Sequence, residues 1–452
     1  MSIKLRMEWA AIWKIAGPLI ISQLCYTGMG FVDALVAGRS NLFDLAGVAV
    51  GGGIWLPIAL FLSGLAYAAT PLVAKDEGSG ATDQSAFWVG QGLILMGALG
   101  LVSAAFLVLG GNWILAQFGA DDETRLAGTH YLWGIALGAP AFCWFQSLRS
   151  ALIGLGQTRL EMIVALSMLA LNFPISAALV FGWGALPAMG SFGIGLGTAL
   201  VFWLGCAVLW LGLLSSHPQS KPQWRHLKPA SDRLNTLFSF GWPIGLAIAV
   251  EASVFSIIAL LLAPLGAVSV ASHTIALNLS AMFFMLPLGI GLATTSRVGY
   301  LRGQGRLDDA FYSSKAAIGL GLAIATATCL LTFIFRAPFA ALYGADAQVT
   351  ALAAGLMIFA AIYQLPDSVQ VIGAGALRGF EDSRGPLVVS LLAYWVVCLP
   401  GGIWLGREGP AIGAAGFWIF LIIGLSLASA GMLWRLGQIR QRLKSPAPSP
   451  LT

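Results

Sequence analysis

The chain has 452 residues, of which 58% are hydrophobic and 10% charged, against about 25% charged residues in typical soluble proteins. Its mean hydropathy is +0.85, which excludes a soluble globular protein. The formal net charge of +5 does not indicate nucleic-acid binding, because the basic residues lie in short gaps between apolar runs. A β-barrel would alternate polar and apolar residues in segments of about 10, and the sequence has no such alternation. We therefore predict an all-α polytopic membrane protein.

Twelve apolar runs are long enough to span a bilayer, which takes about 20 residues of helix. They lie at 15–37, 46–73, 87–110, 129–155, 160–182, 192–214, 237–263, 270–297, 315–336, 351–377, 386–406 and 411–434. The first run is too long for a signal-peptide core and no small-residue cleavage site follows it. We expect this first helix to be retained.

The gaps between the runs suggest how the chain is divided. The longest polar stretch, 215–235, contains three prolines and several basic residues. We predict it to be a cytoplasmic linker between an N-lobe at 1–214 and a C-lobe at 236–437. The tail at 438–452 is basic and then rich in proline and serine, a composition typical of disorder.

Basic residues report the orientation of the helices. With twelve spans, twenty Lys and Arg residues fall on the side that holds both termini, and four fall on the other side. Cytoplasmic loops carry an excess of Lys and Arg. We therefore expect both termini in the cytoplasm of a multi-pass protein of the bacterial cytoplasmic (inner) membrane, and we expect it to be a monomer.

An internal repeat relates the two halves. A shift of 225 positions aligns Pro18 with Pro243 and Gly119-Ala120-Asp121 with Gly344-Ala345-Asp346. Each half then holds six spans, and an even number gives both halves the same orientation. We predict two six-helix lobes related by a pseudo-two-fold axis along the membrane normal, an arrangement that transporters use around a substrate site.

Three acids lie well inside predicted spans: Asp33, Glu251 and Asp367. A carboxylate at such a depth costs about 2.5–3.5 kcal/mol, so it requires a partner, a proton, a cation or water. The repeat duplicates none of them, since Glu251 aligns with Tyr26. We predict an ion-coupled transport site at Glu251 and Asp367. The alternatives are acids neutralised in helix–helix hydrogen bonds and, for Asp33, an interfacial position.

The neighbours of these acids suggest what they bind. Tyr363 precedes Asp367 by four residues and shares its helix face. Phenol and carboxylate oxygens suit Na⁺, and the same acids could bind a proton instead. Aromatic and amide side chains nearby could line a substrate cavity for a lipophilic cation, or could serve only packing and interhelical hydrogen bonds; they are Phe255, Phe283, Phe284, Asn172 and Asn278.

Other features argue against a membrane-embedded enzyme. The sequence has no G-x-x-x-x-G-K-[ST] and no H-E-x-x-H motif. We read His273, at the start of the eighth span, as interfacial rather than as a ligand. All five cysteines lie in apolar runs without paired spacing, so we predict neither disulfides nor a metal site beyond a possible Na⁺ at Glu251 and Asp367. These observations favour secondary transport driven by an ion gradient.

The sequence resembles the NorM-type branch of the multidrug and toxic compound extrusion (MATE) family from about Trp13 to Trp434. The matching motifs are Gly28-Met29-Gly30-Phe31-Val32-Asp33, Glu251-Ala252-Ser253-Val254-Phe255, Leu262-Ala263-Pro264-Leu265-Gly266, Ala360-Ala361-Ile362-Tyr363-Gln364 and Ala376-Leu377-Arg378-Gly379. The resemblance implies twelve helices in two lobes around a central cavity. It also implies export of cationic, lipophilic drugs and dyes in exchange for Na⁺ or H⁺, without a cofactor.

By the same resemblance, Glu251, Asp367 and Tyr363 take the cation-binding role, and Asp33 takes the proton or substrate role of the N-lobe. One departure is Thr274, where relatives often have Gln, which puts contacts at the outer end of the eighth span in doubt. A flippase for lipid-linked oligosaccharides is the alternative function. Its cavity is expected to carry several Arg or Lys residues, whereas the spans here carry acids.

Overall fold

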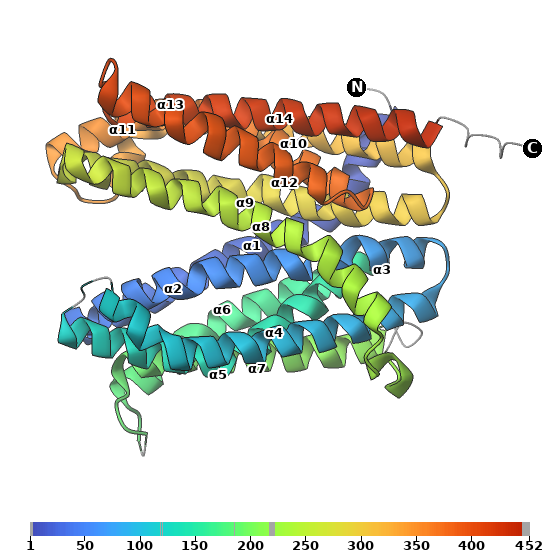
Figure 1. Cartoon of the computed structure of the whole chain (residues 1–452), viewed down its shortest axis with the longest axis horizontal. Coiled ribbons are helices and arrows are strands. Elements are labelled where there is room, and N and C mark those ends of the chain that lie inside the picture. Colours follow the sequence, from blue (N-terminus) through green and yellow to red (C-terminus); the bar gives the residue numbers. More distant parts are fainter. Residues whose placement is uncertain (1–2, 118, 120, 185, 217–221, 445–452) are drawn as a thin grey trace, which may run out of the picture. The chain divides into compact units, whose positions relative to one another are not determined.

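The computed structural model describes the whole chain except residues 1–2, 118, 120, 185, 217–221 and 445–452. The described residues are helical almost throughout. They contain no strand, and the single β-bridge joins Trp183 and Leu186. Long helices run alongside one another within each part of the molecule (Figure 1). The all-α prediction is confirmed.

The helices follow in a simple order. In the first half they are α1 (Ile3–Ser40), α2 (Leu42–Ala66), α3 (Ala69–Gly78), α4 (Thr82–Gln117), α5 (Asp122–Gly154), α6 (Thr158–Phe181) and α7 (Gly190–Ser216). A short 3₁₀ turn, η1 (Trp224–Leu227), leads to the second half. This half contains α8 (Ser231–Leu262), η2 (Ala263–Leu265), α9 (Ala267–Gly303), α10 (Leu307–Ala341), α11 (Ala347–Gly379), α12 (Arg384–Ser390), η3 (Leu391–Cys398), α13 (Leu399–Ile403), η4 (Trp404–Glu408) and α14 (Ala414–Lys444).

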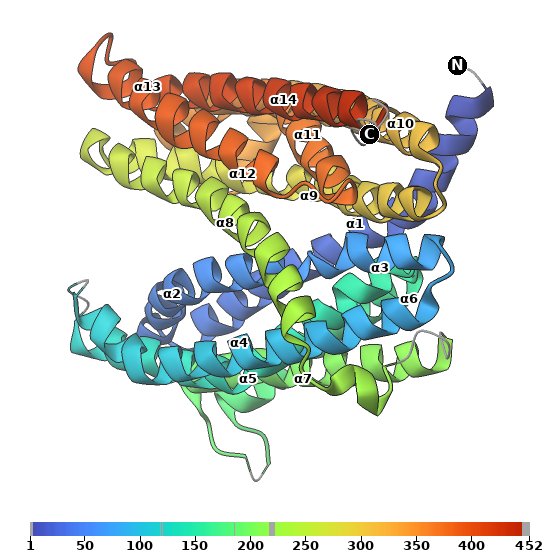
Figure 2. The same ribbon diagram turned by 45° about the vertical axis from the view of Figure 1, so that its right-hand side comes forward.

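Each of the twelve predicted spans lies on one of these helices or on a run of consecutive helices. Eleven helices of the described chain are long and apolar enough to cross a membrane, counting Leu42–Gly78 and Arg384–Glu408 as one each. The remaining predicted span, 129–155, lies on α5, which has 33 residues but begins with charged residues. In Figure 2, α12 and α13 run together beside α14. The chain is therefore a multi-pass membrane protein.

By its packing the chain divides into two compact units. The first comprises Met1–Ala16 and Val250–Thr452, and the second comprises Gly17–Ala249. Both α1 and α8 begin in one unit and end in the other. The predicted lobes at 1–214 and 236–437 assign each of these helices to one lobe, and their boundaries stay a prediction.

Equivalent contacts in the two halves support the 225-residue repeat. In one unit, the Thr70 hydroxyl donates to the carbonyl oxygen of Ser150 at 2.9 Å. In the other, the Thr295 hydroxyl donates to the carbonyl oxygen of Gly375 at 2.8 Å. Both pairs are related by the same shift that aligns Pro18 with Pro243. The two halves therefore reuse one helix-packing scheme.

The predicted linker and tail contain more regular structure than their composition suggested. The stretch at 215–235 includes η1 and the first turn of α8, while residues 217–221 lie outside the described residues. The side-chain amide of Gln91 on α4 donates to the carbonyl oxygens of His226 and Lys228, each at 2.8 Å. These hydrogen bonds hold the start of α8 on α4.

The tail prediction is wrong for residues 438–444, which continue α14. No glycine or proline interrupts this segment after Gly437, and Arg440 and Arg442 lie near the C-terminal end of the helix. Basic side chains there are favoured by the helix dipole. Residues 445–452 lie outside the described residues.

Close packing of α9 against α11 fixes the helix that carries Asp367. A β-carbon added at Gly375 on α11 would lie 2.3 Å from the carbonyl oxygen of Gly291 on α9. Only glycine permits this approach of the two backbones.

Candidate functional site

The two deepest predicted acids lie in the same unit. Glu251 is on α8 and is partly exposed, whereas Asp367 is on α11 with a relative exposure of 2%. The two carboxylates interact electrostatically. The Gln370 side-chain amide donates to Oε2 of Glu251 at 3.4 Å. The structure thus brings Glu251 and Asp367 together, with an amide between the helices that carry them.

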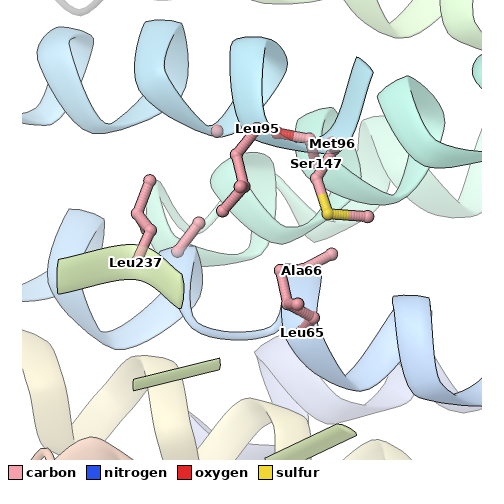
Figure 3. Close-up of a pocket in the computed structure, with 8 residues that line it drawn as sticks. Leu65, Ala66, Leu95, Met96, Ser147 and Leu237 are labelled. Carbon is pink, nitrogen blue, oxygen red and sulfur yellow. The ribbon is translucent and has the colours of Figure 1, made fainter. Parts of the chain in front are cut away.

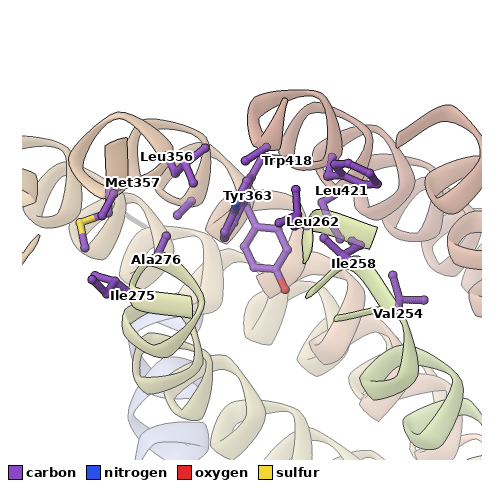
Figure 4. Close-up of a cluster of buried hydrophobic side chains, with 14 of the residues drawn as sticks. Val254, Ile258, Leu262, Ile275, Ala276, Leu356, Met357, Tyr363, Trp418 and Leu421 are labelled. Carbon is purple, nitrogen blue, oxygen red and sulfur yellow. The ribbon is translucent and has the colours of Figure 1, made fainter. Parts of the chain in front are cut away.

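Tyr363 lies one turn before Asp367 and is buried. Its ring packs edge-on against Phe255 and Trp418, with centroid distances of 6.3 and 6.0 Å. Its hydroxyl points out of the surrounding apolar cluster (Figure 4). It interacts electrostatically with Asp367 and Glu251. A phenol oxygen therefore lies near both carboxylates, while an apolar wall holds its ring.

Two polar atoms at these acids have no hydrogen-bond partner among the described residues. They are Oδ1 of Asp367 and Oε1 of Gln370. Buried polar atoms in proteins are normally paired, so this cluster has unused capacity to bind. Both atoms are oxygen acceptors, and hard oxygen ligands suit a cation such as Na⁺ or a proton on a carboxylate.

The described residues contain no group of three or more His, Cys, Asp or Glu side chains arranged to hold a metal ion. The donor set around Asp367 is two carboxylates with neutral oxygens. Such a set fits Na⁺ or H⁺ better than a transition metal, which prefers imidazole or thiolate ligands.

Asp33 occupies a different environment in the other unit. It has a relative exposure of 8% and so is buried within its unit. The Asn172 amide donates to its Oδ1 at 3.1 Å, and the Thr198 hydroxyl donates to its Oδ2 at 2.8 Å. Both carboxylate oxygens therefore have partners, and Asn172 makes the interhelical hydrogen bond considered from the sequence.

The remaining predicted cavity residues lie on α9. Phe283 packs edge-on against Phe339 at a centroid distance of 6.5 Å. Phe284 is partly exposed, and Asn278 is exposed. His273 is fully buried, and its ring lies 5.7 Å from that of Trp418. The side chain sits against the same apolar wall as Tyr363.

A small cavity elsewhere is not part of this cluster. It lies in the unit Gly17–Ala249, and Figure 3 shows apolar side chains around it. The lining residues include Leu65, Ala66, Leu95, Met96, Ser147 and Leu237. None of the residues predicted from the sequence lines it, and it offers no charged group to a cation.

The sequence analysis missed three polar partners of these acids: Gln370, Tyr394 and Thr198. Helical periodicity could have identified Gln370, because it follows Asp367 by three residues and Tyr363 by seven. Tyr394 and Thr198 come from other helices, so only the packing of helices brings them to the acids.

Known proteins resemble this chain in sequence and in fold. A family model described as MatE matches residues 18–178 and 243–404, two ranges that begin at Pro18 and Pro243, the prolines aligned by the repeat. The multidrug resistance protein MdtK of Edwardsiella ictaluri (strain 93-146) is 39% identical over 448 residues, covering 97% of each chain. MdtK of Proteus mirabilis (strain HI4320) is 38% identical over 440 residues, covering 96% of each.

Solved structures share the fold at lower identity. A crystal structure of MATE in complex with MaD3S has a TM-score of 0.88 and 18% identity, covering 96% of this chain and 97% of that one. The eukaryotic MATE transporter AtDTX14 has a TM-score of 0.85 and 18% identity, covering 97% of this chain and 99% of that one. These matches extend over nearly the whole chain.

Proposed function

This chain belongs to the MatE family, and from that premise we propose that it is a secondary active multidrug exporter. It exchanges cationic, lipophilic drugs for Na⁺ or H⁺ through a central cavity. The observation that carries this proposal is the cluster of Glu251, Asp367 and Tyr363, with polar atoms left without partners. As a member of a transporter family the protein is not an enzyme.

The exchange follows from the electrostatics of this cluster. Two carboxylates close together in a low-dielectric site repel each other, and a cation or a proton relieves that repulsion. The ion therefore favours a form of the protein in which the acids are neutralised. A cationic drug binds more tightly when the same acids are charged, so drug and ion compete for the same carboxylates.

This competition is reciprocal. An ion that weakens drug binding by some factor must itself be bound more weakly, by the same factor, when drug is present. An inward gradient of the ion can therefore drive the drug outward. Asp33, held by Asn172 and Thr198, is proposed to handle a proton or the drug in its own unit. With the basic side of the chain in the cytoplasm, export is directed out of the cell across the inner membrane.

The alternative function, a flippase for lipid-linked oligosaccharides, needs groups that bind a pyrophosphate. Among the described residues of the cluster around Tyr363, Glu251 and Asp367 are acids. The base Arg378 interacts electrostatically with Glu251. The acids outnumber the base in this cluster. This balance favours a cationic substrate.

Dye binding to the purified protein tests the proposal. We expect raised Na⁺, or lowered pH if the ion is H⁺, to weaken the binding of a fluorescent cationic dye to the wild type. The effect should vanish in Glu251→Gln. Asp382→Asn, which removes a carboxylate bonded to Arg435 at 2.6 Å, is the control and should keep the ion dependence. Dye affinity that ignores both ions in the wild type would reject antiport at this site.

Transport in liposomes then identifies the ion. With dye inside and an imposed gradient of Na⁺ or of pH, the gradient that drives dye movement is that of the coupling ion. Dye movement that needs neither gradient would point to a channel or a flippase.

A further inference from the structure

A second buried ionic cluster lies in the unit Gly17–Ala249, apart from every residue proposed above. Arg149 on α5 and Glu161 on α6 have relative exposures of 2% and 0%. Nε of Arg149 donates to Oε1 of Glu161 at 2.6 Å. An uncompensated charge at such a place is strongly destabilising, so the pair needs all its hydrogen-bonding capacity filled.

Helix α1 supplies most of the remaining partners. The hydroxyl of Ser22 donates to Oε2 of Glu161, and the hydroxyl of Tyr26 donates to Oε1 at 3.0 Å. Arg149 donates to the side-chain oxygen of Gln23, and its guanidinium lies 4.8 Å from the centre of the Tyr26 ring. Three side chains within five positions of α1 thus meet one ion pair on α5 and α6.

Helices α1 and α6 meet again at Asp33. The contact of Ser22 with Glu161 and the contact of Asp33 with Asn172 both join residues 139 positions apart. Since the two contacts share one separation, α1 and α6 run parallel, in a single register, from one contact to the other. The two contacts are eleven positions apart on each helix, which is about three turns.

Between these two contacts the side chain of Leu169 on α6 reaches the backbone of α1 at Gly28. A β-carbon added at Gly28 on α1 would lie 3.2 Å from the side chain of Leu169 on α6. An axial slip of one helix along the other would therefore separate the Glu161 contact and the Asp33 contact together.

We propose that the Arg149–Glu161 pair sets the register of α1 on α6 and thereby holds the Asp33 carboxylate between Asn172 and Thr198. The pair is a positioning device for transport: it acts through Asp33 and does not itself touch ion or drug. The transport consequence rests on the proposed function of Asp33, whereas the effect on register does not.

Cross-linking tests the register without transport. In a background in which all five cysteines are replaced by alanine, Gly28→Cys and Leu169→Cys are combined and oxidised. We expect a high yield of disulfide in this background. Replacing the pair as Arg149→Met/Glu161→Gln removes both charges at once, so neither is left buried alone. We expect the yield to fall, and yields for Gly28→Cys with Ala165→Cys or Phe173→Cys, one turn away on α6, to rise.

Asp382→Asn is the matched control for this experiment, because it breaks a close ion pair with Arg435 in the other unit. We expect it to leave the Gly28–Leu169 yield unchanged. A yield that is also unchanged in Arg149→Met/Glu161→Gln would overturn the proposal.

Transport kinetics test the link to Asp33. Residues that act through one network show non-additive effects. We expect Arg149→Met/Glu161→Gln to change KM and the maximal rate in the same proportions as Asp33→Asn changes them. The variant that combines all three changes should transport within about twofold of Asp33→Asn alone. Multiplied effects, or wild-type kinetics in the pair variant, would overturn the proposal. If the wild type moves no dye, the proposed function fails, and the cross-linking result still decides the register.

Discussion

One pair of equivalent positions differs sharply between the two halves. On α8 and α11, Glu251 and Gln370 form a polar contact of 3.4 Å. The positions that the repeat aligns with them, Tyr26 and Phe145 on α1 and α5, form an edge-on aromatic contact with a centroid distance of 5.8 Å. The same place in the packing scheme thus holds an acid and an amide in one half and two aromatic rings in the other.

The comparison separates the scaffold from the site. The Thr70 and Thr295 hydrogen bonds recur in both halves because the helices pack in the same way. The acids do not recur, so the packing does not require them. They also differ in how far they are satisfied: both oxygens of Asp33 accept hydrogen bonds, whereas Oδ1 of Asp367 has no partner among the described residues. This difference supports our proposal that Asp367 and Glu251 bind the ion and that Asp33 has a more constrained role.

The largest effect is expected when the acids of the cluster are neutralised. Glu251→Gln and Asp367→Asn should each reduce gradient-driven export at least about tenfold, equivalent to about 1.4 kcal/mol, because neither amide can exchange an ion or a proton. Drug resistance of cells producing each variant is the measurement, with the amount of protein in the membrane as control. Wild-type resistance at normal protein levels would show that the acids are dispensable.

Neutralising Asp33 is expected to have a smaller effect. Asp33→Asn keeps a polar side chain between Asn172 and Thr198 and leaves the cluster around Tyr363 intact. Export should therefore fall by roughly 3- to 10-fold, on the order of 1 kcal/mol. Dye efflux from cells over a range of external pH measures this. Normal efflux with an unchanged pH dependence would mean that Asp33 only joins helices.

The aligned pair offers a third test. Gln370→Leu removes the amide that donates to Glu251 while keeping the size of the side chain. Because a net hydrogen bond is worth about 0.5–1.5 kcal/mol, the ion concentration that displaces half the dye should change by about 2- to 10-fold.

Phe145→Leu, at the equivalent position, is the control for that change. Phe145 is buried in an apolar cluster, so this variant should lose thermal stability and keep its ion dependence. An equal change of ion dependence in both variants would trace the effect of Gln370→Leu to packing.

The fold was largely predictable and the site only in part, for physical reasons. Apolar runs of membrane length identify helices one at a time, so all twelve predicted spans lie on helices. Buried acids such as Glu251 are conspicuous because charge is rare in these runs. Partners contributed by other helices, such as Thr198, carry no such signal.

Arg149 and Glu161 were missed for a related reason. They lie near the ends of predicted spans, where charged residues are common, and only the packing of α1, α5 and α6 shows that both are buried. Asn278 is the opposite case: it lies within a predicted span, yet it is exposed on the surface of its unit.

The smallest effect tests the scaffold itself. Thr70→Val and Thr295→Val each remove a hydroxyl that donates to a carbonyl oxygen of a neighbouring helix, and valine keeps the shape of the side chain. If the two halves share one packing scheme, each change should lower the free energy of unfolding by a similar amount, about 0.5–1.5 kcal/mol. Thermal denaturation of the purified protein in detergent measures the two losses side by side. The ion dependence of dye binding should stay as in the wild type for both variants, since neither threonine touches the acids. A large loss of unfolding free energy in one variant and none in the other would mean that the two equivalent hydrogen bonds stabilise the protein unequally. The repeat would then preserve the path of the helices without preserving the energies of their contacts.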